Sequence, residues 1–560
     1  MGNAHEVQTP RGLFATGEVG LYLNHYIANY KGGRNESFMF GCDHRSLWYD
    51  YDLVSAYTTG MTHLALPDYA RGGSIDSQKV LKLSNVELLQ GYYIINCSFK
   101  FPDSVKYPSI PCYIDKTTTV YPLSGKAMLT GPEFLLARNQ NCEIKIKSTF
   151  YIPPLMKETK RVGLIEIKET VKPFQTIIHE LQRKRKEHPK GHILNAMYKE
   201  LGNSIYGNIV RGMGNKQTFN TKTCEMNRVN GTELSNPILA SWSTAFIRSV
   251  IGECLDNIKK LGGKVVSVTT DGFITDVLNL EDRLSELPED RTPLLALFKK
   301  LRGELNDNHN DLTALELKNK SRGIISYSTR GQLGLELGIK ATTGFQSFGY
   351  SHKELVSIFT EGLKHREKEF EYTQSRTRSS KDVYKKGGHV TLQHKDQKVR
   401  LLYDNRRNII ENKDFDGYDM SEHFFDSKPF STTHECLYRR FLSKFSHTKP
   451  YIKTSPVRVT RSSYRSYVEI AARTFIKGYL AESPCFGLRG DEFPYYKSII
   501  SFIKGFDLTK GMKITKQSLS NLKHRKIILR PVPKTREVIA LITEIKKIIP
   551  HFDETTFIKL

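Results

Sequence analysis

The stretch KVVSVTTDGFITDV, residues 264–277, determines how the rest of the chain is interpreted. Its β-branched first half predicts a buried strand, and a second strand begins at Phe273 after a short turn. Asp271 and Gly272 form the Asp-Gly pair typical of a two-residue hairpin turn, because glycine tolerates a positive φ. We therefore expect a rigid hairpin that holds the Asp271 carboxylate at its tip. An Asp-Gly pair alone indicates only a turn, so a metal site requires a second carboxylate from elsewhere.

A second acidic strand lies upstream, in SLWYDYDLVSAYTTGM, residues 46–61. Its alternating pattern predicts a β-strand, which places Asp50 and Asp52 on the same face. Burying either carboxylate without a counter-ion is costly. The pattern is thus compatible with a metal site or with an edge strand that has one solvent-exposed face.

Two helical patterns follow, VKPFQTIIHELQRKRKEHPKG (171–191) and HILNAMYKELGNSIYGNIV (192–210), and together they predict a helical hairpin. On the second helix Lys199, Asn203 and Tyr206 share one face. The basic last turn of the first helix fits either phosphate binding or a solvated face that complements the helix dipole. A long amphipathic helix is expected from Pro237 to the Gly-Gly pair at 262–263.

The composition favours a polyanion as partner. The chain has 560 residues, and Lys and Arg exceed Asp and Glu to give a net charge of +25. A globular protein this basic usually meets nucleic acid, although a basic surface alone can be merely solvated. We find no apolar run long enough for a membrane span, no secretory signal and no C-x-x-C pair, so we expect an intracellular, reducing location without a membrane partner.

In order, D-x-x-S-A-Y (52–57), K-x-x-x-N-S-x-Y-G (199–207) and T-T-D-G (269–272) resemble the three motifs of family B DNA polymerases. The helix motif matches at every fixed position. The Y-x-G-G segment at 30–33 and the insertion TVYPLSGKAMLTGPEFLLA are similar to the protein-primed branch found in viruses, phages and linear plasmids. The resemblance covers roughly residues 25–345 well and the remainder loosely.

This resemblance implies an α+β right-hand polymerase with an antiparallel palm sheet, helical-hairpin fingers and a thumb. The implied divisions are a linker (1–45), a palm strand (46–65), a β-rich insertion (66–165), fingers (166–215), a second palm part (216–345), a thumb (346–415) and a basic C-terminal extension (416–560).

The resemblance also implies the roles of individual residues. Asp52 and Asp271 would be the catalytic metal ligands for two Mg²⁺ ions, with Mn²⁺ as a substitute. The nucleotide-binding residues would be Lys199, Asn203, Tyr206, Tyr57, Ser55, Arg185 and Lys186, with Tyr57 excluding a 2′-hydroxyl. The DNA-binding residues would be Lys320, Arg322, Tyr30, Gly32 and Gly33.

Two features depart from the family pattern. The third motif usually reads D-T-D-S, and here Thr269 and Gly272 stand in place of its first Asp and its Ser. The residues before the first motif are too few for a 3′–5′ exonuclease, so we expect no proofreading in this chain and, if proofreading occurs, a separate exonuclease.

We thus expect a DNA-directed DNA polymerase whose partners are a DNA template-primer and dNTPs, with a terminal priming protein as a further candidate partner. A reverse transcriptase shares palm carboxylates, but the K-x-x-x-N-S-x-Y-G helix argues against it. A catalytically inactive, nucleic-acid-binding scaffold is the other alternative, and Thr269 is its best support.

Overall fold

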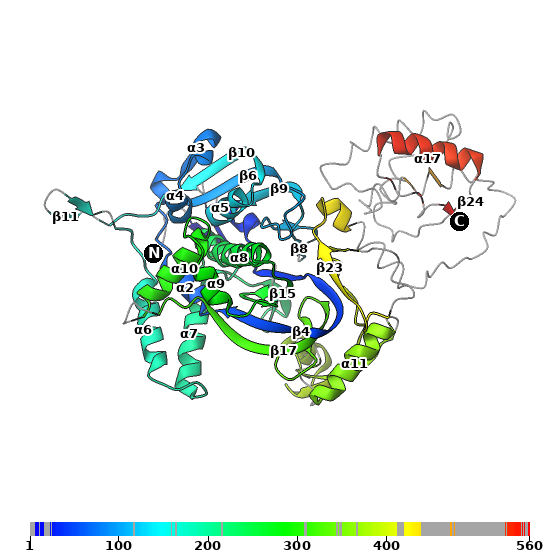
Figure 1. The fold of residues 1–560 in the computed structure, drawn as a ribbon. Coiled ribbons are helices and arrows are strands. Elements are labelled where there is room, and N and C mark those ends of the chain that lie inside the picture. Colours follow the sequence, from blue (N-terminus) through cyan, green and yellow to red (C-terminus); the bar gives the residue numbers. More distant parts are fainter. Residues whose placement is uncertain are drawn as a thin grey trace. The chain divides into compact units, whose positions relative to one another are not determined.

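Both acidic strands lie in one antiparallel sheet of nine strands, as the computed structural model of the chain shows (Figure 1). Along its main path the strand order is β19-β18-β17-β4-β16-β15-β3, and β23 pairs with both β4 and β22. The strands are β3 (Arg34–Ser37), β4 (Met39–Leu53), β15 (Val265–Thr270), β16 (Gly272–Thr275), β17 (Leu315–Ser328), β18 (Gly331–Gly334), β19 (Lys340–Thr342), β22 (Asn408–Ile409) and β23 (Phe424–Lys428). Helices and an antiparallel sheet together confirm the α+β class.

The chain divides into two compact units, residues 1–431 and 432–560, each described by itself. The structure describes residues 6–9, 12–15, 23, 25–115, 118–157, 160–162, 165–167, 169–213, 217–306, 311–342, 345, 350–365, 368–410, 419–437, 471–472, 475, 532–533, 535–549, 552, 554 and 558–559. The Asp-rich stretch near residue 412, where we expected a boundary, and most of the basic C-terminal extension lie outside these residues.

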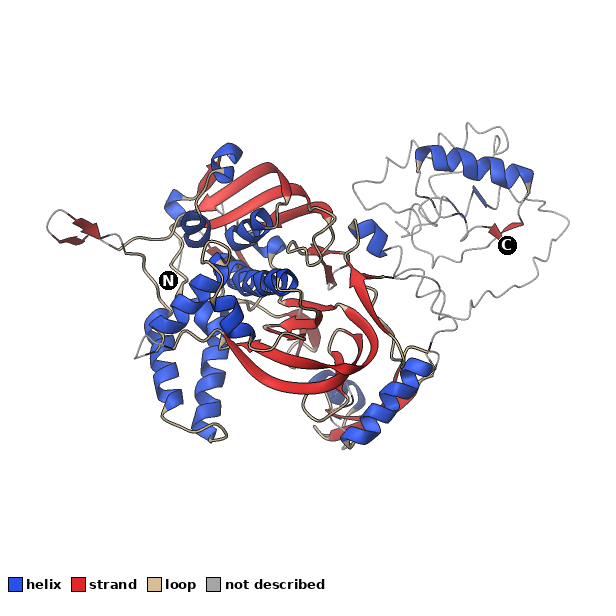
Figure 2. Ribbon diagram, viewed as in Figure 1, coloured by secondary structure: helices blue, strands red, loops and turns tan. Residues whose placement is uncertain are grey.

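Strands β4 and β17 form the long, curved centre of the sheet (Figure 2). In β4 the buried Tyr49, Tyr51 and Leu53 alternate with the half-buried Asp50 and Asp52, as the sequence pattern predicts. The strand begins at Met39, earlier than the alternating pattern at 46–61 predicts. The Gly-Gly pair in residues 30–41 predicts a loop leading into a strand, and β3 occupies part of that segment. The two halves of β4 join different hydrophobic cores. In the first half Phe40 and Cys42 pack with Ile325, and in the second half the buried residues from Trp48 to Leu53 pack in the main core.

The insertion between the first two motifs contains its own four-stranded sheet, ordered β5-β10-β6-β9. Its strands are β5 (Gly73–Ile75), β6 (Tyr92–Lys100), β9 (Ser124–Leu129) and β10 (Glu143–Ile152), with β7 (Cys112–Tyr113) paired to β8 (Thr119–Val120). The sequence of this β-rich insertion predicts one short helix near residues 131–138, which is α5 (Gly131–Asn139). The structure adds α3 (Ser77–Leu81), α4 (Asn85–Gln90) and the 3₁₀ turn η1 (Tyr69–Arg71), so that expectation was wrong. The capping box of Ser84 and Glu87 was the missed signal for α4.

The helical hairpin and the long helix are both present. They are α6 (Gln175–Lys186), α7 (Ile193–Ile209) and α8 (Pro237–Lys260), and α2 (Ala56–Thr62) packs against α7 and α8. Glycine is common just after a helix, so Gly207 predicts the end of the second helix, but α7 continues to Ile209. Helix α8 is long and apolar enough to cross a bilayer by composition, yet its apolar window is completely buried inside the protein. It is therefore the core helix behind the sheet.

The other elements of the first unit are two helices after β16 and several peripheral pieces. They are α9 (Leu280–Ser285), α10 (Pro293–Glu304), α11 (His352–Lys364), α12 (Ser380–Lys386) and the hairpins β1–β2 (Glu6–Thr9, Gly12–Ala15), β11–β12 (Lys160–Val162, Ile165–Ile167), β13–β14 (Gln217–Asn220, Glu225–Arg228) and β20–β21 (Phe370–Thr377, Leu392–Val399). The second unit contains β24 (Val532–Pro533), α17 (Arg536–Ile548) and β25 (Ile558–Lys559).

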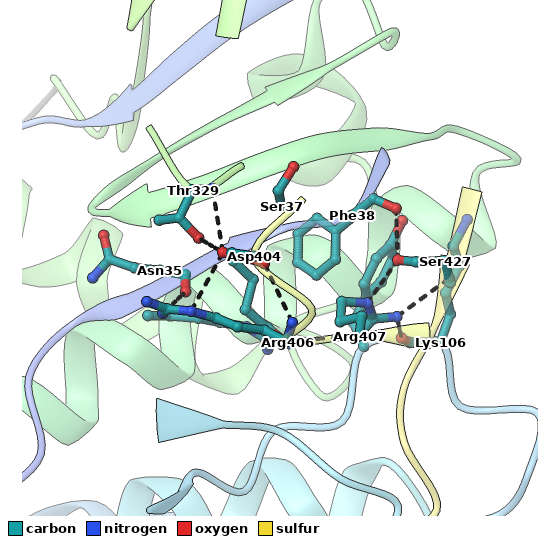
Figure 3. Close-up of polar contacts among 12 residues, drawn as sticks. Asn35, Ser37, Phe38, Lys106, Thr329, Asp404, Arg406, Arg407 and Ser427 are labelled. Atoms are coloured by element: carbon teal, nitrogen blue, oxygen red, sulfur yellow. Dashed lines mark hydrogen bonds and ion pairs between the residues drawn. The ribbon is translucent and has the colours of Figure 1, made fainter. Parts of the chain in front are cut away.

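The edge strand β3 is held in place by residues that lie far along the chain (Figure 3). Arg407 Nε donates to Ser427 Oγ at 2.9 Å, and Ser427 Oγ donates to the Phe38 carbonyl at 2.6 Å. Arg406 Nη1 donates to the Asn35 carbonyl at 2.8 Å. Because β3 pairs with β15, these contacts support the hairpin that carries Asp271.

Candidate active site

Asp52, on β4, and Asp271, in the turn that precedes the neighbouring strand β16, meet at one end of the sheet. Asp52 lies in β4 directly opposite Gly272 of β16, and the Leu53 N–H donates to the Asp271 carbonyl at 2.8 Å. Antiparallel pairing therefore places the two carboxylates side by side, although 219 positions separate them in the sequence.

The hairpin is confirmed, but its turn is shifted by one residue from the predicted position. Thr269 pairs with Gly272, so the two turn residues are Thr270 and Asp271. Thr270, not Gly272, has the positive φ, at 60°. A Cβ atom on Gly272 would lie 3.1 Å from Asp52 Oδ1 and 3.0 Å from the Tyr51 carbonyl. Glycine is therefore required here for close approach to Asp52 and not for its conformational freedom.

The two carboxylates repel each other. Burial and then the neighbouring Asp271 charge raise the pKa of Asp52 to about 7. Burial also raises the pKa of Asp271, while the charges of Lys318 and Lys199 oppose that rise. The Lys318 ammonium lies 3.9 Å from Asp52 Oδ2. This half-buried, like-charged pair is a donor set that a bound cation would stabilise.

The donor set fits magnesium better than a metal that needs a full protein cage. Among the described residues, no group of three or more His, Cys, Asp or Glu side chains could hold a metal ion. Mg²⁺ keeps several waters and commonly takes only one or two carboxylates together with substrate phosphates. Asp52 and Asp271 meet that requirement.

A pocket of about 750 Å³ opens above the two acids. Seven of the predicted residues line it, namely Asp52, Ser55, Tyr57, Arg185, Lys199, Asn203 and Asp271. They come from β4, the start of α2, both helices of the hairpin and the β15–β16 turn. Three motifs separated in sequence therefore converge on one cavity.

Tyr206 does not line the pocket but supports a residue that does. Its ring stacks on Tyr57 with centroids 4.2 Å apart and planes at 28°. Tyr57 is thus backed by an aromatic stack that fixes its ring against the pocket wall.

Arg185 and Lys186 face different environments. Arg185 lines the pocket, and its Nε donates to Asn195 Oδ1 at 3.2 Å, across the hairpin. Lys186 is not among the pocket-lining residues, and its ammonium donates to Asn306 Oδ1. Of these two predicted nucleotide-binding residues, the structure brings only Arg185 to the cavity.

Ser55 has an unusual backbone conformation at the start of α2. Its φ of 52° and ψ of 43° are left-handed, and its hydroxyl makes no capping bond. The Ser55 carbonyl instead accepts from the Thr59 N–H and from Thr58 Oγ1, both at 2.9 Å. This turn redirects the chain from the acidic strand into α2 at the pocket wall.

The predicted DNA-binding residues lie outside the cavity. Lys320 and Arg322 are exposed on β17, and Arg322 Nη1 donates to the Arg45 carbonyl at 3.3 Å. Two charged residues on this strand that we had not assigned to the site, Glu316 and Lys318, do line the pocket. Their two-residue spacing in LELKNK was a usable signal, because alternate strand residues share a face.

The Y-x-G-G segment is anchored from below by a buried ion pair. Arg248 Nη1 donates to the Lys31 and Gly32 carbonyls at 3.0 and 2.6 Å, and Arg248 Nη2 contacts Glu133 Oε1 at 2.6 Å. A Cβ atom on Gly33 would lie only 2.7 Å from Thr270 Cγ2. The segment is therefore pressed against the turn that carries Asp271.

Comparison with known proteins finds similarity to a DNA polymerase over part of the chain. No family model matches the chain. Over 317 residues it is 32% identical to the primer-independent DNA polymerase PolB of Escherichia coli, a match that covers 56% of this chain and 34% of that protein. The chain thus spans about one third of the length of this curated relative.

The solved structures that align with this chain do so with low sequence identity. Phi29 DNA polymerase complexed with primer-template DNA and incoming nucleotide substrates aligns with a TM-score of 0.43 and 11% identity, covering 70% of this chain and 64% of that one. The family B DNA polymerase from the archaeon Pyrobaculum calidifontis aligns with a TM-score of 0.25 and 11% identity, covering 72% and 43%.

Proposed function

We propose that this chain is a DNA-directed DNA polymerase that adds dNTPs to a 3′-hydroxyl on a DNA template. One observation carries the proposal. Residues of three separate motifs, including Asp52, Tyr57, Lys199 and Asp271, line the same pocket. The similarity to a DNA polymerase over 317 residues supports the same reaction class. In this proposal the nine-stranded sheet is the palm, α6 and α7 are the fingers, and the region around α11 is the thumb.

Asp52 and Asp271 would hold two Mg²⁺ ions, or Mn²⁺ in their place. The bound ions would supply Lewis acidity for the attacking and leaving oxygens of an in-line displacement. The close approach of Gly272 keeps the acidic strand and the hairpin tip in contact, so the two carboxylates remain within reach of shared cations.

The other pocket residues bind and orient the nucleotide in this proposal. Lys199 and Arg185 place positive charge where a triphosphate would lie. Tyr57, fixed by its stack on Tyr206, would pack under the sugar and exclude a 2′-hydroxyl. Asn203, on the same wall, would contact the nascent base pair.

The origin of the primer remains a separate proposal. The Y-x-G-G segment and the insertion favour a protein primer, in replication of a viral or plasmid genome. The similarity to a polymerase named for primer independence favours a second candidate, synthesis without a supplied primer. A comparison of primed and unprimed circular single-stranded DNA, with and without a candidate priming protein, distinguishes these routes.

The test is primer extension by the purified chain with Mg²⁺ and labelled dNTPs. Asp52→Asn and Asp271→Asn should each reduce the rate by about a thousandfold or more, because each removes a metal-binding charge. Asp290→Asn is the matched control, since Asp290 is exposed and lies outside the pocket lining. It should extend the primer as the wild type does.

Two results would contradict the assignment. An active Asp271→Asn variant would show that the wrong carboxylate has been chosen. A wild-type chain that binds DNA but extends no primer with Mg²⁺ or Mn²⁺ would favour the inactive, nucleic-acid-binding scaffold.

A further inference from the structure

Arg302 is a buried cation that faces the proposed catalytic pocket. It lies in the last turn of α10, is only 5% exposed and is one of the residues that line the cavity. Its Nη1 atom is buried and has no hydrogen-bond partner in the part of the chain that the structure describes. Nothing in the sequence pattern indicated it, because an arginine in a final helical turn usually complements the helix dipole.

The intramolecular contacts of Arg302 compensate only part of its charge. Its Nε donates to the Thr313 carbonyl at 3.4 Å. Its Nη2 lies 3.9 Å from Asp311 Oδ2, and the Asp311 side chain is 54% exposed. An ion pair this long with a solvated partner is weak. A buried donor without a partner is unfavourable, more so in a charged group, so the Nη1 group is poised to bind an anion.

A second guanidinium reinforces this end of the cavity. Arg185 approaches from α6 and lines the same pocket. Its positive charge acts with burial to lower the pKa of Arg302, although Asp311 opposes that shift. Two cations in a partly desolvated pocket repel each other, and an anion between them would remove that repulsion.

This basic end differs from the acidic end of the same cavity. At the acidic end, the charges of Lys199 and Lys318 act to lower the pKa of Asp271. At the basic end, the charges of Arg302 and Lys186 act to lower the pKa of Asp311. The cavity therefore has one region where a carboxylate pair needs cations and another where guanidinium groups need an anion. A nucleotide bound with metal ions presents both complements in one molecule.

We propose that Arg302, together with Arg185, forms an anion subsite for the terminal phosphates of the incoming nucleoside triphosphate and for the pyrophosphate that leaves. The inference rests on the proposed polymerase function and adds a residue from α10 to that site. A guanidinium suits phosphate because its planar fork can donate two parallel hydrogen bonds. A phosphate of the DNA backbone has the same chemistry, so the experiment must separate the two sources.

The experiment measures direct binding of tripolyphosphate and of a single-stranded 12-nucleotide DNA to the full chain by titration calorimetry. Arg302→Met should weaken tripolyphosphate binding about tenfold or more, as expected for loss of a charge-assisted hydrogen bond, and leave DNA affinity unchanged. Lys300→Met is the matched control, because Lys300 lies on the same helix, is exposed and is absent from the pocket lining. It should bind both ligands as the wild type does.

Arg302→Lys is a second variant, which keeps the test decisive if Arg302→Met fails to fold. It keeps the charge but loses the planar fork, and should give an intermediate affinity for tripolyphosphate. The subsite is overturned if Arg302→Lys and Arg302→Met bind tripolyphosphate as tightly as the wild type. The assignment to the nucleotide is overturned if DNA affinity falls equally.

Binding and polymerisation report separately on the two proposals. A chain that extends no primer, yet binds tripolyphosphate in an Arg302-dependent way, would refute the polymerase function and retain the anion subsite. A chain that extends primers with unchanged tripolyphosphate affinity in the Arg302 variants would refute only the subsite.

Discussion

Glu253 is a buried carboxyl group that, among the described residues, is not paired with a cation but caps the N-terminus of a neighbouring helix. It lies in α8 and is 2% exposed. Its carboxylate oxygens accept from the Leu294 and Leu295 N–H groups at 3.4 and 2.8 Å, at the start of α10. Thr292, the N-cap of α10, makes no side-chain capping bond, so Glu253 supplies the cap from another helix. This contact fixes the helix whose other end carries Arg302.

Stability near neutral pH should depend on Glu253. Burial raises the pKa of Glu253 to about 8. The protonated Glu253 side chain contributes fully to the stability of the wild-type chain when the pH is below its unfolded-state pKa. As the pH rises toward 8 the unfolded chain loses the proton first, so stability falls by at most about 1.4 kcal/mol per pH unit. Glu253→Gln has no such proton, so its melting temperature relative to the wild type should rise between pH 5 and pH 8.

Scanning calorimetry at several pH values checks this prediction. Glu286→Gln is the control, because Glu286 is exposed. A melting-temperature difference between Glu253→Gln and the wild type that stays constant with pH would show that Glu253 is not protonated in the folded state.

Individual site residues differed in how far the sequence could reveal them. Asp52, Lys199 and Asp271 sit in motifs whose local pattern also fixes their strand or helix, so the sequence predicted where they would lie. Lys186 sits beside Arg185 in the same basic turn, and only the contact with Asn306, far along the chain, separates the two. Arg302 enters the pocket through tertiary packing of α10, which no local pattern encodes.

At the scale of elements, local signals predicted the existence of most helices and strands but not their fine register. Pro237 and the Gly-Gly pair bounded α8 correctly because both act on the backbone of their own segment. The β15–β16 turn is shifted by one residue from the predicted position because Gly272 packs closely against β4, a strand that is far away in the sequence. Sheet neighbours thus overrode a turn preference.

The two glycines of the Y-x-G-G segment should differ in their tolerance of substitution. Gly33→Ala would place a Cβ 2.7 Å from Thr270 Cγ2 and 3.0 Å from Thr270 Cα, whereas a Cβ on Gly32 meets no atom within 4 Å. We expect Gly33→Ala to displace the Asp271 turn and to lower polymerisation by about tenfold or more, since small misplacements of catalytic groups are costly. Gly32→Ala should remain close to wild type.

Primer-extension rates of the two variants, measured beside their melting temperatures, check this prediction. Equal rates for Gly32→Ala and Gly33→Ala would mean that the contact with Thr270 does not position Asp271. A loss confined to Gly32→Ala would reverse the assignment.

For the whole molecule, the net charge of +25 predicts electrostatic binding of nucleic acid. If the chain neutralises six or more phosphates, its affinity for duplex DNA should fall on the order of a thousandfold between 50 and 200 mM salt. Fluorescence anisotropy with a labelled primer-template measures this dependence. A parallel titration with sucrose, which screens no charge, should leave the DNA affinity nearly unchanged. A DNA affinity that also stays unchanged with salt would refute the electrostatic interpretation.

The pairing of β4 has a consequence for how the chain is made. This 15-residue strand is complete at Leu53, but its neighbours β16 and β17 begin only at Gly272 and Leu315. At about 5–20 residues per second, the first of these partners leaves the ribosome roughly 10–45 seconds later. Throughout that interval a long strand rich in aromatic residues has both hydrogen-bonding edges open, which is an aggregation hazard. We therefore expect the nascent chain to depend on chaperones, and the proposed catalytic centre to be among the last parts of the first unit to assemble during translation.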